Sequence, residues 1–322
     1  MKVLVTGCAG FIGMHCAQRL LARGDEVVGI DNLSSYYSVE LKQARLAELS
    51  GSRAFRFERL DISDAAALAA LFDREKPDAV LHLAAQAGVR HSLENPGSYI
   101  QANLVGFANV LEGCRRHQPG HLVYASSSSV YGSSTRLPWS EADNVDHPVS
   151  LYAATKKSNE LMAHAYSHLH GFPSTGLRFF TVYGPWGRPD MSPMLFATAI
   201  MEGRPIQVFN HGDMQRDFTY VDDIVEGTLR VLDRPAPGTP PSEVFNIGNH
   251  QAVGLLDYIA AMERALGREA RLEMKPMQPG DVKATYADTS KLAAAVGFAP
   301  STPLAMGLER FAAWFKRYYG HG

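Results

Sequence analysis

Two residues with acid–base side chains, Tyr152 and Lys156, stand four positions apart in the run SLYAATKK. A helix places residues at this spacing on one face, so the phenol and the ammonium would point the same way. A free phenol has a pKa of about 10, and a neighbouring cation lowers it. Tyr152 is therefore a candidate general base near neutral pH, although the same spacing is common on solvated helices that have no chemical role.

A cluster of serines, in YASSSSVYG, precedes this pair by about one loop. A serine hydroxyl at this place would hold the reacting oxygen of an alcohol and share its proton with the base. The alternative interpretation is a loop of small residues that only serves the fold. The serines are therefore not equal candidates for a chemical role.

Three glycines, Gly7, Gly10 and Gly13, are spaced three apart and directly follow the apolar run KVLVT. Glycines at this spacing let the backbone approach a pyrophosphate, whose charge the start of the following helix stabilises. The pattern alone is weak, because small residues are common where helices begin. Its place between a predicted strand and a predicted helix favours a dinucleotide-binding loop.

Asp31 ends the next apolar run, EVVGID, close to where dinucleotide-binding folds carry the acid that holds the adenosine ribose. Its carboxylate would accept hydrogen bonds from the ribose hydroxyls and would repel a 2′-phosphate. Asn32 follows with no arginine beside it, so we expect NAD as the cofactor and not NADP. Asp61 and Ile62, at the end of the third predicted strand, are candidates for the adenine edge, with an ordinary strand end as the alternative.

Short apolar runs alternate with helical patterns over the first two-thirds of the chain. This alternation predicts an α/β fold, a doubly wound parallel sheet with helices on both of its faces. The expected strands are 2–6, 26–31, 54–61, 79–85, 121–127 and 174–180, and the expected helices include 11–23, 64–74, 98–117 and 151–170.

Beyond Phe180 the composition changes to the Gly- and Pro-rich run VYGPWGRPDMSP, which is typical of a loop. Residues 219–250 are expected to return to the first domain, where EVFNIG would add a strand to the main sheet. We therefore expect a dinucleotide-binding domain of residues 1–180 plus 219–250. A smaller, discontinuous C-terminal substrate domain would comprise residues 181–218 plus 251–322, mostly helical in its last part.

The composition is that of a globular protein, with 46% hydrophobic and 20% charged residues and a formal net charge of -2. This balance gives no basic surface for nucleic acid or an anionic membrane. No apolar run approaches the ~20 residues of a membrane helix, and no apolar leader precedes the first strand. Three cysteines without a CxxC pair indicate reduced thiols, so we expect a cytoplasmic protein.

His164 and His168 have the spacing of a metal-binding pair on the helix that carries Tyr152. They would point away from Tyr152, however, and no third ligand is near in sequence. We therefore expect a solvent-facing or interface pair, and no metal site.

The chain resembles the extended short-chain dehydrogenase/reductase family, and within it the nucleotide-sugar 4-epimerases. The resemblance rests on GCAGFIG, DNLSSYY, HLAAQAGVR, YASSSSVYG, YAATK, LRFFTVYGPWGRPDM, QRDFTYVDDI, FNIG and MQPGDV, which match in order over nearly the whole chain. HLAAQAGVR, TVYGPWGRPDM and DNLSSYY make it closer to the UDP-glucuronate 4-epimerases than to the UDP-galactose enzymes. The resemblance implies a Rossmann-type fold and a homodimer packed through the helices around 98–117 and 151–170.

The resemblance also implies roles for individual residues. Ser127 would be the catalytic hydroxyl, Tyr152 the base and Lys156 its partner, while Ser128 and Ser129 would face the sugar. Ser126 would serve the fold where the strand ends. The candidate contacts of NAD are Gly7, Gly10, Phe11, Ile12, Gly13, Asp31, Asn32, Asp61, Ile62, Leu83, Ala84, Ala85, Tyr152 and Lys156.

On the substrate side, Thr181 stands where UDP-galactose epimerases typically have an asparagine. A hydroxyl there suits a carboxylate, which needs donors. Arg90 and Arg188 would give charge-assisted hydrogen bonds to that carboxylate or to phosphate, with a solvated surface side chain as the alternative for each.

The diphosphate side rests on two further matches. Arg216 in QRDF matches the family's diphosphate ligand, and Asp281 in PGDV matches a residue near the nucleotide. Gln278 stands where UDP-galactose epimerases often have an arginine, a departure that leaves the diphosphate contacts less well defined.

These residues together predict the interconversion of UDP-glucuronic acid and UDP-galacturonic acid, by NAD-dependent oxidation at carbon 4, rotation of the 4-keto sugar and re-reduction. A 4-keto uronate loses carbon dioxide readily, so its carboxylate must be held, a role that we assign to Thr181 and Arg188. The alternatives are a 4-epimerase of UDP-glucose or UDP-N-acetylglucosamine, then a UDP-glucuronate decarboxylase, then a non-catalytic dinucleotide sensor. The intact Ser127, Tyr152 and Lys156 argue against the last.

Overall fold

The computed structural model describes residues 1–277 and 283–320, and the chain divides into two compact units. The first unit consists of Met1–Ser133, Glu141–Phe179 and Val225–Phe245. The second consists of Ser134–Ser140, Phe180–Ile224 and Asn246–Gly322.

Residues 134–140, which lie inside the first domain as it was expected from the sequence, join the second unit. Backbone hydrogen bonds explain this, because Trp139 donates to the carbonyl of Tyr286 at 3.0 Å and accepts from the N–H of Asp288 at 2.9 Å. The side-chain amide of Asn246 also donates to the Trp139 carbonyl, at 2.8 Å. Such long-range pairing of a loop leaves no periodic pattern in the sequence.

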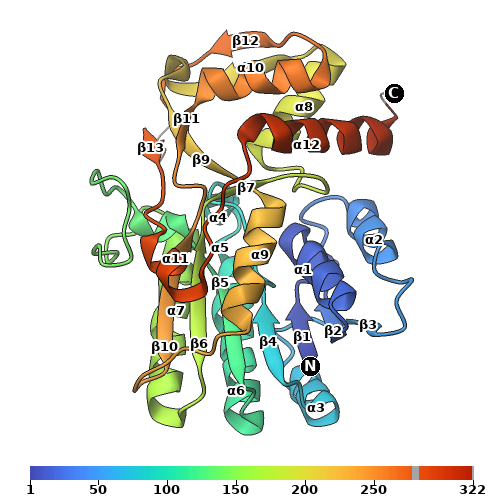
Figure 1. The fold of residues 1–322 in the computed structure, drawn as a ribbon, viewed down its shortest axis with the longest axis vertical. Helices are drawn as coiled ribbons and strands as arrows, with labels where there is room; N and C mark the ends of the chain where they lie inside the picture. Colours follow the sequence, from blue (N-terminus) through green and yellow to red (C-terminus); the bar gives the residue numbers. More distant parts are fainter. Residues whose placement is uncertain (278–282, 321–322) are drawn as a thin grey trace. The chain divides into compact units, whose positions relative to one another are not determined.

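The first unit is built on a seven-stranded sheet in the order β10-β6-β5-β4-β1-β2-β3 (Figure 1). The pairs from β3 to β6 are all parallel, which confirms the predicted doubly wound α/β fold. The strand order reverses between β1 and β4, the kind of position where ligands bind in such sheets. The strands are β1 Lys2–Thr6, β2 Glu26–Asp31, β3 Phe55–Arg59, β4 Ala79–His82, β5 His121–Ser127, β6 Ser174–Phe179 and β10 Ser242–Ile247.

The helices of the first unit lie between these strands much as the sequence predicted. The expected helix over 98–117 differs, because it contains a π-helical stretch and begins after two short turns of helix. The helices are α1 Phe11–Ala22, α2 Val39–Ala47, α3 Ala65–Glu75, α4 His91–Glu94, α5 Pro96–Tyr99, the π-helical Ile100–Gly106, α6 Phe107–His117, the 3-10 turn Ser128–Tyr131, α7 Leu151–His170 and α9 Val221–Leu232, of which the residues from Val225 on belong to this unit.

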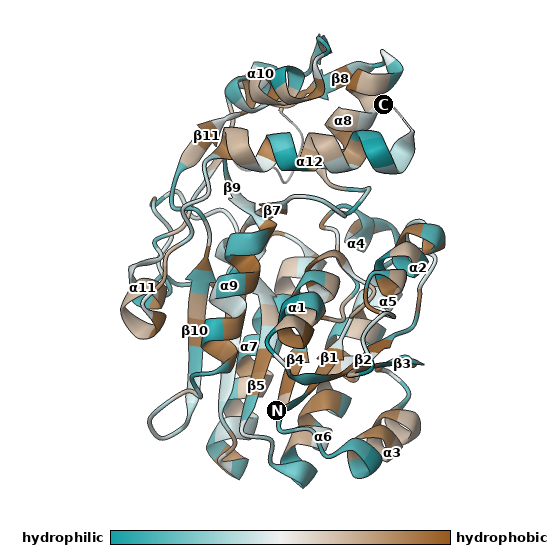
Figure 2. Cartoon of the chain, turned by 45° about the vertical axis from the view of Figure 1, so that its right-hand side comes forward, coloured by the Kyte–Doolittle hydropathy of each residue, from teal (hydrophilic) through white to brown (hydrophobic). Residues whose placement is uncertain are grey.

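The hydrophobic core of this unit lies between the sheet and the helices α3, α6 and α7. Phe72, Phe107 and Leu111 are almost fully buried there, and they pack with strand residues such as Leu4 and Val80. Figure 2 shows the hydrophobic character of the central strands. Burial of each such side chain contributes about 1.5–3 kcal/mol, so this core holds the strand ends that carry the polar residues described below.

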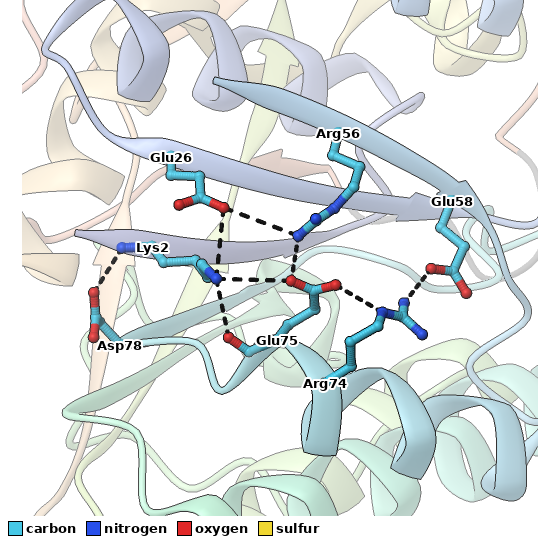
Figure 3. Close-up of polar contacts among 7 residues, drawn as sticks. All are labelled: Lys2, Glu26, Arg56, Glu58, Arg74, Glu75 and Asp78. Atoms are coloured by element: carbon cyan, nitrogen blue, oxygen red, sulfur yellow. Dashed lines mark hydrogen bonds and ion pairs between the residues drawn. The ribbon is translucent and has the colours of Figure 1, made fainter. Parts of the chain in front are cut away.

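A charge cluster lies where the strands of the main sheet begin (Figure 3). Its centre is Glu75, at the end of α3, whose side chain is only 3% exposed. Arg56 and Arg74 pair with its carboxylate, the latter at 2.8 Å, and the Nζ of Lys2 lies 3.8 Å away. Burial alone would raise the pKa of Glu75, but the hydrogen bond from Arg74 and the neighbouring cations outweigh it and lower the pKa.

Among its described residues, the second unit contains two small sheets, four α-helices and the short 3-10 helix Phe209–Gly212. The strands β7 Thr181–Tyr183, β9 Gln215–Tyr220, β11 Ala252–Gly254 and β13 Ala284–Thr285 form one sheet, and β8 Pro205–Val208 pairs with β12 Arg271–Met274. The helices are α8 Ser192–Glu202, α10 Leu255–Leu266, α11 Ser290–Val296 and α12 Leu304–Tyr319. The sequence pattern predicted a mostly helical last part and the short strand β8, but the strands β11, β12 and β13, of two to four residues, are too short to show a period.

Within the two described stretches, no helix combines the length and apolar character needed to cross a bilayer. Nor do three or more His, Cys, Asp or Glu side chains of those stretches gather where they could hold a metal ion. His164 and His168 are exposed on α7.

Candidate active site

The glycine loop connects β1 to α1, and its backbone atoms pack closely against one another. Gly7 has a φ of +73°, a conformation that favours glycine, and its N–H donates to the Ile30 carbonyl at 2.8 Å. A Cβ atom on Gly10 or Gly13 would lie 2.9 or 2.1 Å from the Gly7 carbonyl oxygen. Only glycines therefore fit this cradle, and they leave the first N–H groups of α1, at Phe11 and beyond, without acceptors in the helix. This arrangement suits a pyrophosphate.

Asp31, at the end of β2, turns its carboxylate toward the glycine loop. Its two oxygens accept the backbone N–H groups of Ala9 at 3.2 Å and Leu33 at 2.8 Å. Burial raises the pKa of Asp31, and these hydrogen bonds oppose that effect. A carboxylate offers about four acceptor positions, so two ribose hydroxyls would still find partners.

The other residues expected at the adenosine end are Asn32, Asp61 and Ile62. The side-chain amide of Asn32 donates to the Asp61 carboxylate at 2.8 Å. Ile62 differs, because its side chain is buried in the core against Gly106. The Ile62 carbonyl accepts a hydrogen bond from the side-chain amide of Asn109 at 2.9 Å.

Two cations behind the glycine loop were missed in the sequence. Arg45, on α2, is fully buried and donates to the Ala9 carbonyl at 3.0 Å and to the Tyr37 hydroxyl at 2.7 Å. Lys42 is also buried, with its Nζ 4.4 Å from the centre of the Tyr37 ring. Both add positive charge near a loop that is suited to phosphate. The sequence pattern could have revealed them, because Lys42 and Arg45 occupy positions on the buried face of an amphipathic helix.

The serine cluster spans the end of β5 and the following 3-10 turn. Ser127 ends the strand, and its hydroxyl oxygen caps the turn by accepting the N–H of Ser129 at 3.2 Å. Ser128 and Ser129 are partly buried in the turn itself. Ser126 is turned elsewhere, because its hydroxyl donates to Glu160 at 2.6 Å.

Tyr152 and Lys156 lie in the first turns of α7, which Ser150 caps by accepting the N–H of Ala153 at 3.1 Å. The Nζ of Lys156 lies 6.0 Å from the centre of the Tyr152 ring. The same Nζ donates to the carbonyl of Ala125 in β5 at 2.8 Å. Burial lowers the pKa of Lys156 to about 8, so its side chain is still mostly protonated, and therefore charged, at neutral pH.

The segment after β4 adjoins the glycine loop. The N–H groups of Leu83 and Ala84 donate to the carbonyl and the hydroxyl of Thr6, both at 3.1 Å. Ala84 is also so close to Gly7 that a Cβ on that glycine would meet its nitrogen at 2.7 Å. Leu83, Ala84 and Ala85 are therefore next to the proposed pyrophosphate loop.

A buried asparagine that the sequence pattern did not reveal holds the next residues of this segment. Asn103, in the π-helical stretch, accepts the N–H of Gln86 at 2.8 Å and donates to its carbonyl at 3.0 Å. The Asn103 amide also donates to the Thr155 hydroxyl at 3.0 Å. It thereby ties the 86–90 segment to the turn of α7 between Tyr152 and Lys156. Arg90 follows at an exposed position.

The remaining candidates lie in the second unit. Thr181 begins β7 and is half-buried. Arg188 pairs with Asp190 through two contacts, at 3.1 and 2.5 Å, so its guanidinium already faces a carboxylate. Arg216, on β9, donates to two backbone carbonyls, at 2.8 and 3.2 Å. The predictions for Asp281 and Gln278 lie outside the described residues.

Within the first unit, loops and helix starts that follow parallel strands carry the functional residues. These residues form a glycine cradle, an acid suited to a ribose, and a base with its cation. A dinucleotide-binding protein of the α/β class, equipped to move a proton, has this construction. Comparison with known proteins takes the assignment further. The family model described as "NAD dependent epimerase/dehydratase family" matches residues 3–248, and the chain belongs to this family.

Two relatives and one solved structure are similar over almost the whole chain. A "Probable UDP-glucuronate 4-epimerase" of Rhizobium meliloti is 47% identical, covering 99% of this chain and 98% of its own length. "UDP-glucuronate 4-epimerase 3" of Arabidopsis thaliana is 48% identical, over 100% of this chain and 78% of the relative. The crystal structure of UDP-glucuronic acid 4-epimerase from Bacillus cereus, in complex with UDP-glucuronic acid and NAD, is 36% identical with a TM-score of 0.92. The match covers 99% of this chain and 100% of that chain.

Proposed function

We propose that this chain is an NAD-dependent isomerase that interconverts UDP-glucuronic acid and UDP-galacturonic acid by epimerisation at carbon 4. The observation that carries the proposal is the buried ammonium of Lys156 beside the ring of Tyr152, in a chain similar to UDP-glucuronate 4-epimerases over nearly its whole length. A base with a fixed cation is what removal of a proton from a sugar hydroxyl requires.

Tyr152 would remove the proton from the 4-hydroxyl. The charge of Lys156 favours the phenolate, and because its Nζ is tied to the Ala125 carbonyl the charge stays in place. Ser127 would donate to or accept from the same sugar oxygen and so hold it next to the phenol. When the sugar is re-reduced, Tyr152 would return the proton, so no acid or base is consumed.

NAD would be held by Gly7, Gly10 and Gly13 at its pyrophosphate and by Asp31 at its adenosine ribose, and when bound it supplies the hydride acceptor and donor for carbon 4. The cradle fits this group, since three glycines and the start of α1 leave room and donors for a pyrophosphate. Lys42 and Arg45 would add favourable charge behind it.

Thr181 and Arg188 would hold the carboxylate of the 4-keto uronate, with Arg90 as a further donor, in an orientation that disfavours loss of carbon dioxide. Because Asp190 already faces Arg188, the uronate would have to displace or share this pairing. Arg216, with Asp281, would contact the nucleotide and its diphosphate. The first unit would thus bind NAD and the second the nucleotide sugar.

A 4-epimerase of a neutral UDP-sugar is the second candidate, and one observation favours it. The charge of Arg188 is compensated by Asp190, so the loop as it stands does not demand an anionic substrate. A UDP-glucuronate decarboxylase would require the carboxylate to be released, which the same arginine would oppose.

We also propose that the enzyme is a homodimer, packed through the helices around 98–117 and 151–170. Leu161 and Leu169 on α7 are 58% and 70% exposed, and Ile100 and Val105 are exposed on the π-helical stretch. Exposed apolar side chains on two adjoining segments favour contact with a partner. A cytoplasmic location is a further expectation, which three buried free cysteines support.

Product analysis tests the function directly. Purified protein would be incubated with UDP-glucuronic acid and, in a matched reaction, with UDP-glucose, first without and then with added NAD, and followed by proton NMR. We expect UDP-galacturonic acid from the first substrate and little turnover of the second, with Tyr152→Phe as the inactive control. Turnover of UDP-glucose alone would establish the neutral-sugar enzyme, and a UDP-pentose would establish a decarboxylase.

A further inference from the structure

A buried ion pair lies beneath the serine cluster, and none of the roles above uses it. Glu160 on α7 and Arg178 on β6 have side chains that are 6% and 4% exposed. They form a two-pronged contact, with Arg178 Nε and one terminal nitrogen each 2.8 Å from a different Glu160 oxygen. We propose that this pair is a positioning device that fixes the serines 127–129 against the helix that carries Tyr152 and Lys156. The proposal rests on the function proposed above.

The first attachment of the serine segment is through Ser126. Its hydroxyl donates to Glu160 at 2.6 Å, on the oxygen that also receives Arg178 Nε. Ser126 and Arg178 are direct partners across β5 and β6, so both side chains stand on the face of the sheet that α7 covers. The residue before Ser126 is Ala125, whose carbonyl holds Lys156. Strand and helix are thus joined at two consecutive residues.

The second attachment is through Tyr131, the last residue of the 3-10 turn. A guanidinium nitrogen of Arg178 donates to the Tyr131 hydroxyl at 3.0 Å, and the guanidinium carbon lies 4.9 Å from the centre of the Tyr131 ring. Ser127, Ser128 and Ser129 therefore lie between two residues that are attached to the same ion pair. A segment attached at both ends has little freedom to move its hydroxyls.

The same pair also sets the position of α7. Glu160 is one turn beyond Lys156 and two turns beyond Tyr152, so all three lie along one side of the helix. Arg178 is anchored in β6, which pairs with β5. The guanidinium of Arg178 thus fixes the positions of both the serines and the base relative to β6. An ion pair this deeply buried is costly to keep, and conformational specificity is a reason to retain it.

Two mild substitutions test the proposal without exposing either charge. Ser126→Ala removes the first attachment and Tyr131→Phe removes only the hydroxyl of the second, and the double variant removes both. A misplacement of reacting groups by about 1 Å costs on the order of 100-fold in rate. We therefore expect each single variant to lower kcat about 3- to 10-fold and the double variant about 30- to 100-fold, with a smaller change in KM.

Three controls separate positioning from stability and from the proposed activity. Tyr166→Phe removes a 2.8 Å hydrogen bond to Glu112 from the same helix, away from the serines, and should leave kcat unchanged. Ser126→Thr keeps the hydroxyl and should retain most of kcat. Thermal unfolding and bound NAD per chain should stay near those of the unchanged protein in all variants.

An unchanged kcat in the double variant would overturn the proposal. It would also be overturned if the losses in kcat merely followed losses of unfolding temperature or of bound NAD, or if Tyr166→Phe lost as much activity. Should the unchanged protein epimerise no UDP-sugar at all, the proposed function fails, and the positioning role that rests on it fails with it.

Discussion

The ammonium of Lys156 lies 6.0 Å from the centre of the Tyr152 ring while it donates to the backbone carbonyl of Ala125 at 2.8 Å. The hydrogen bond fixes where the charge sits, and burial limits its screening by solvent. Helix α7 alone would bring the two side chains to one face. It is the contact with β5 that gives the cation a single position and relates the pair to Ser127, two residues further along the strand.

Loss of the Lys156 charge should remove activity at alkaline pH. Burial lowers the pKa of Lys156 from 10.5 to about 8, so the amine becomes neutral as the pH rises through that value. We expect kcat to fall above pH of about 8 and Lys156→Met to lower kcat at least about 100-fold at pH 7. The control is Lys157→Met, which alters an adjacent lysine that pairs with Asp146. A kcat that stays flat to pH 10 would contradict the role of the charge.

Substitution of Gly13 should prevent cofactor binding. A Cβ there would lie 2.1 Å from the Gly7 carbonyl oxygen, so Gly13→Ala must move the loop or the start of α1. We expect the affinity for NAD, measured by calorimetry on cofactor-free protein, to fall at least about 100-fold, because a bound pyrophosphate depends on this geometry. Gly51→Ala is the matched control, since a Cβ there meets nothing within 4 Å. Equal affinities in the two variants would refute the cradle.

His82 and His121 should make the fold sensitive to acid. Burial, the largest cause for each, lowers the pKa of His82 to about 3 and that of His121 to about 4. Between these values and the unfolded value of about 6.5 the unfolded chain binds more protons, so stability falls as the pH falls through this window. In urea unfolding, His82→Gln should lose less stability than the unchanged protein between pH 7 and 5. His147→Gln, at an exposed position, should behave like the unchanged protein.

Glu75 should contribute more to stability than its neighbour Glu58, although both pair with Arg74 (Figure 3). The side chain of Glu75 is 3% exposed and that of Glu58 is 41% exposed. We expect Glu75→Gln to lower the free energy of unfolding by about 1–2 kcal/mol and Glu58→Gln by less than about 0.5 kcal/mol. Because the pKa of Glu75 is lowered, its contribution is present above the unfolded value of about 4.3 and lost as the pH falls below it. Equal losses at pH 7 would contradict the role of burial.

The sequence predicted the main sheet because apolar strand runs such as KVLVT alternate with helical patterns, which is typical of parallel sheets. It also predicted EVFNIG as a strand of that sheet, which β10 confirms. Asp31 and the glycines could be predicted because binding a ribose and a pyrophosphate each requires a particular residue type at a particular sequence position relative to a strand. Their adjacency in the structure follows from the parallel strands β1 and β2.

Other parts of the site could not be predicted, because they depend on pairing across long separations. Nothing local marks Asn103 as the partner of Gln86, or Arg178 as the partner of Glu160. Arg45 would be expected on a solvated helix face, yet it is buried under the glycine loop. Arg188 was predicted to bind the carboxylate or phosphate of the substrate, whereas Asp190, two residues later, already pairs with it.

The fate of deuterium at carbon 4 shows whether the hydride leaves and returns at that carbon. UDP-glucuronic acid deuterated at that carbon would be incubated with the purified enzyme, and the products followed by proton and deuterium NMR. We expect UDP-galacturonic acid that keeps the deuterium at carbon 4, because the hydride is removed and returned within one site while only the hydroxyl proton passes through Tyr152. Exchange of the deuterium with solvent, or its appearance in a UDP-pentose, would contradict it.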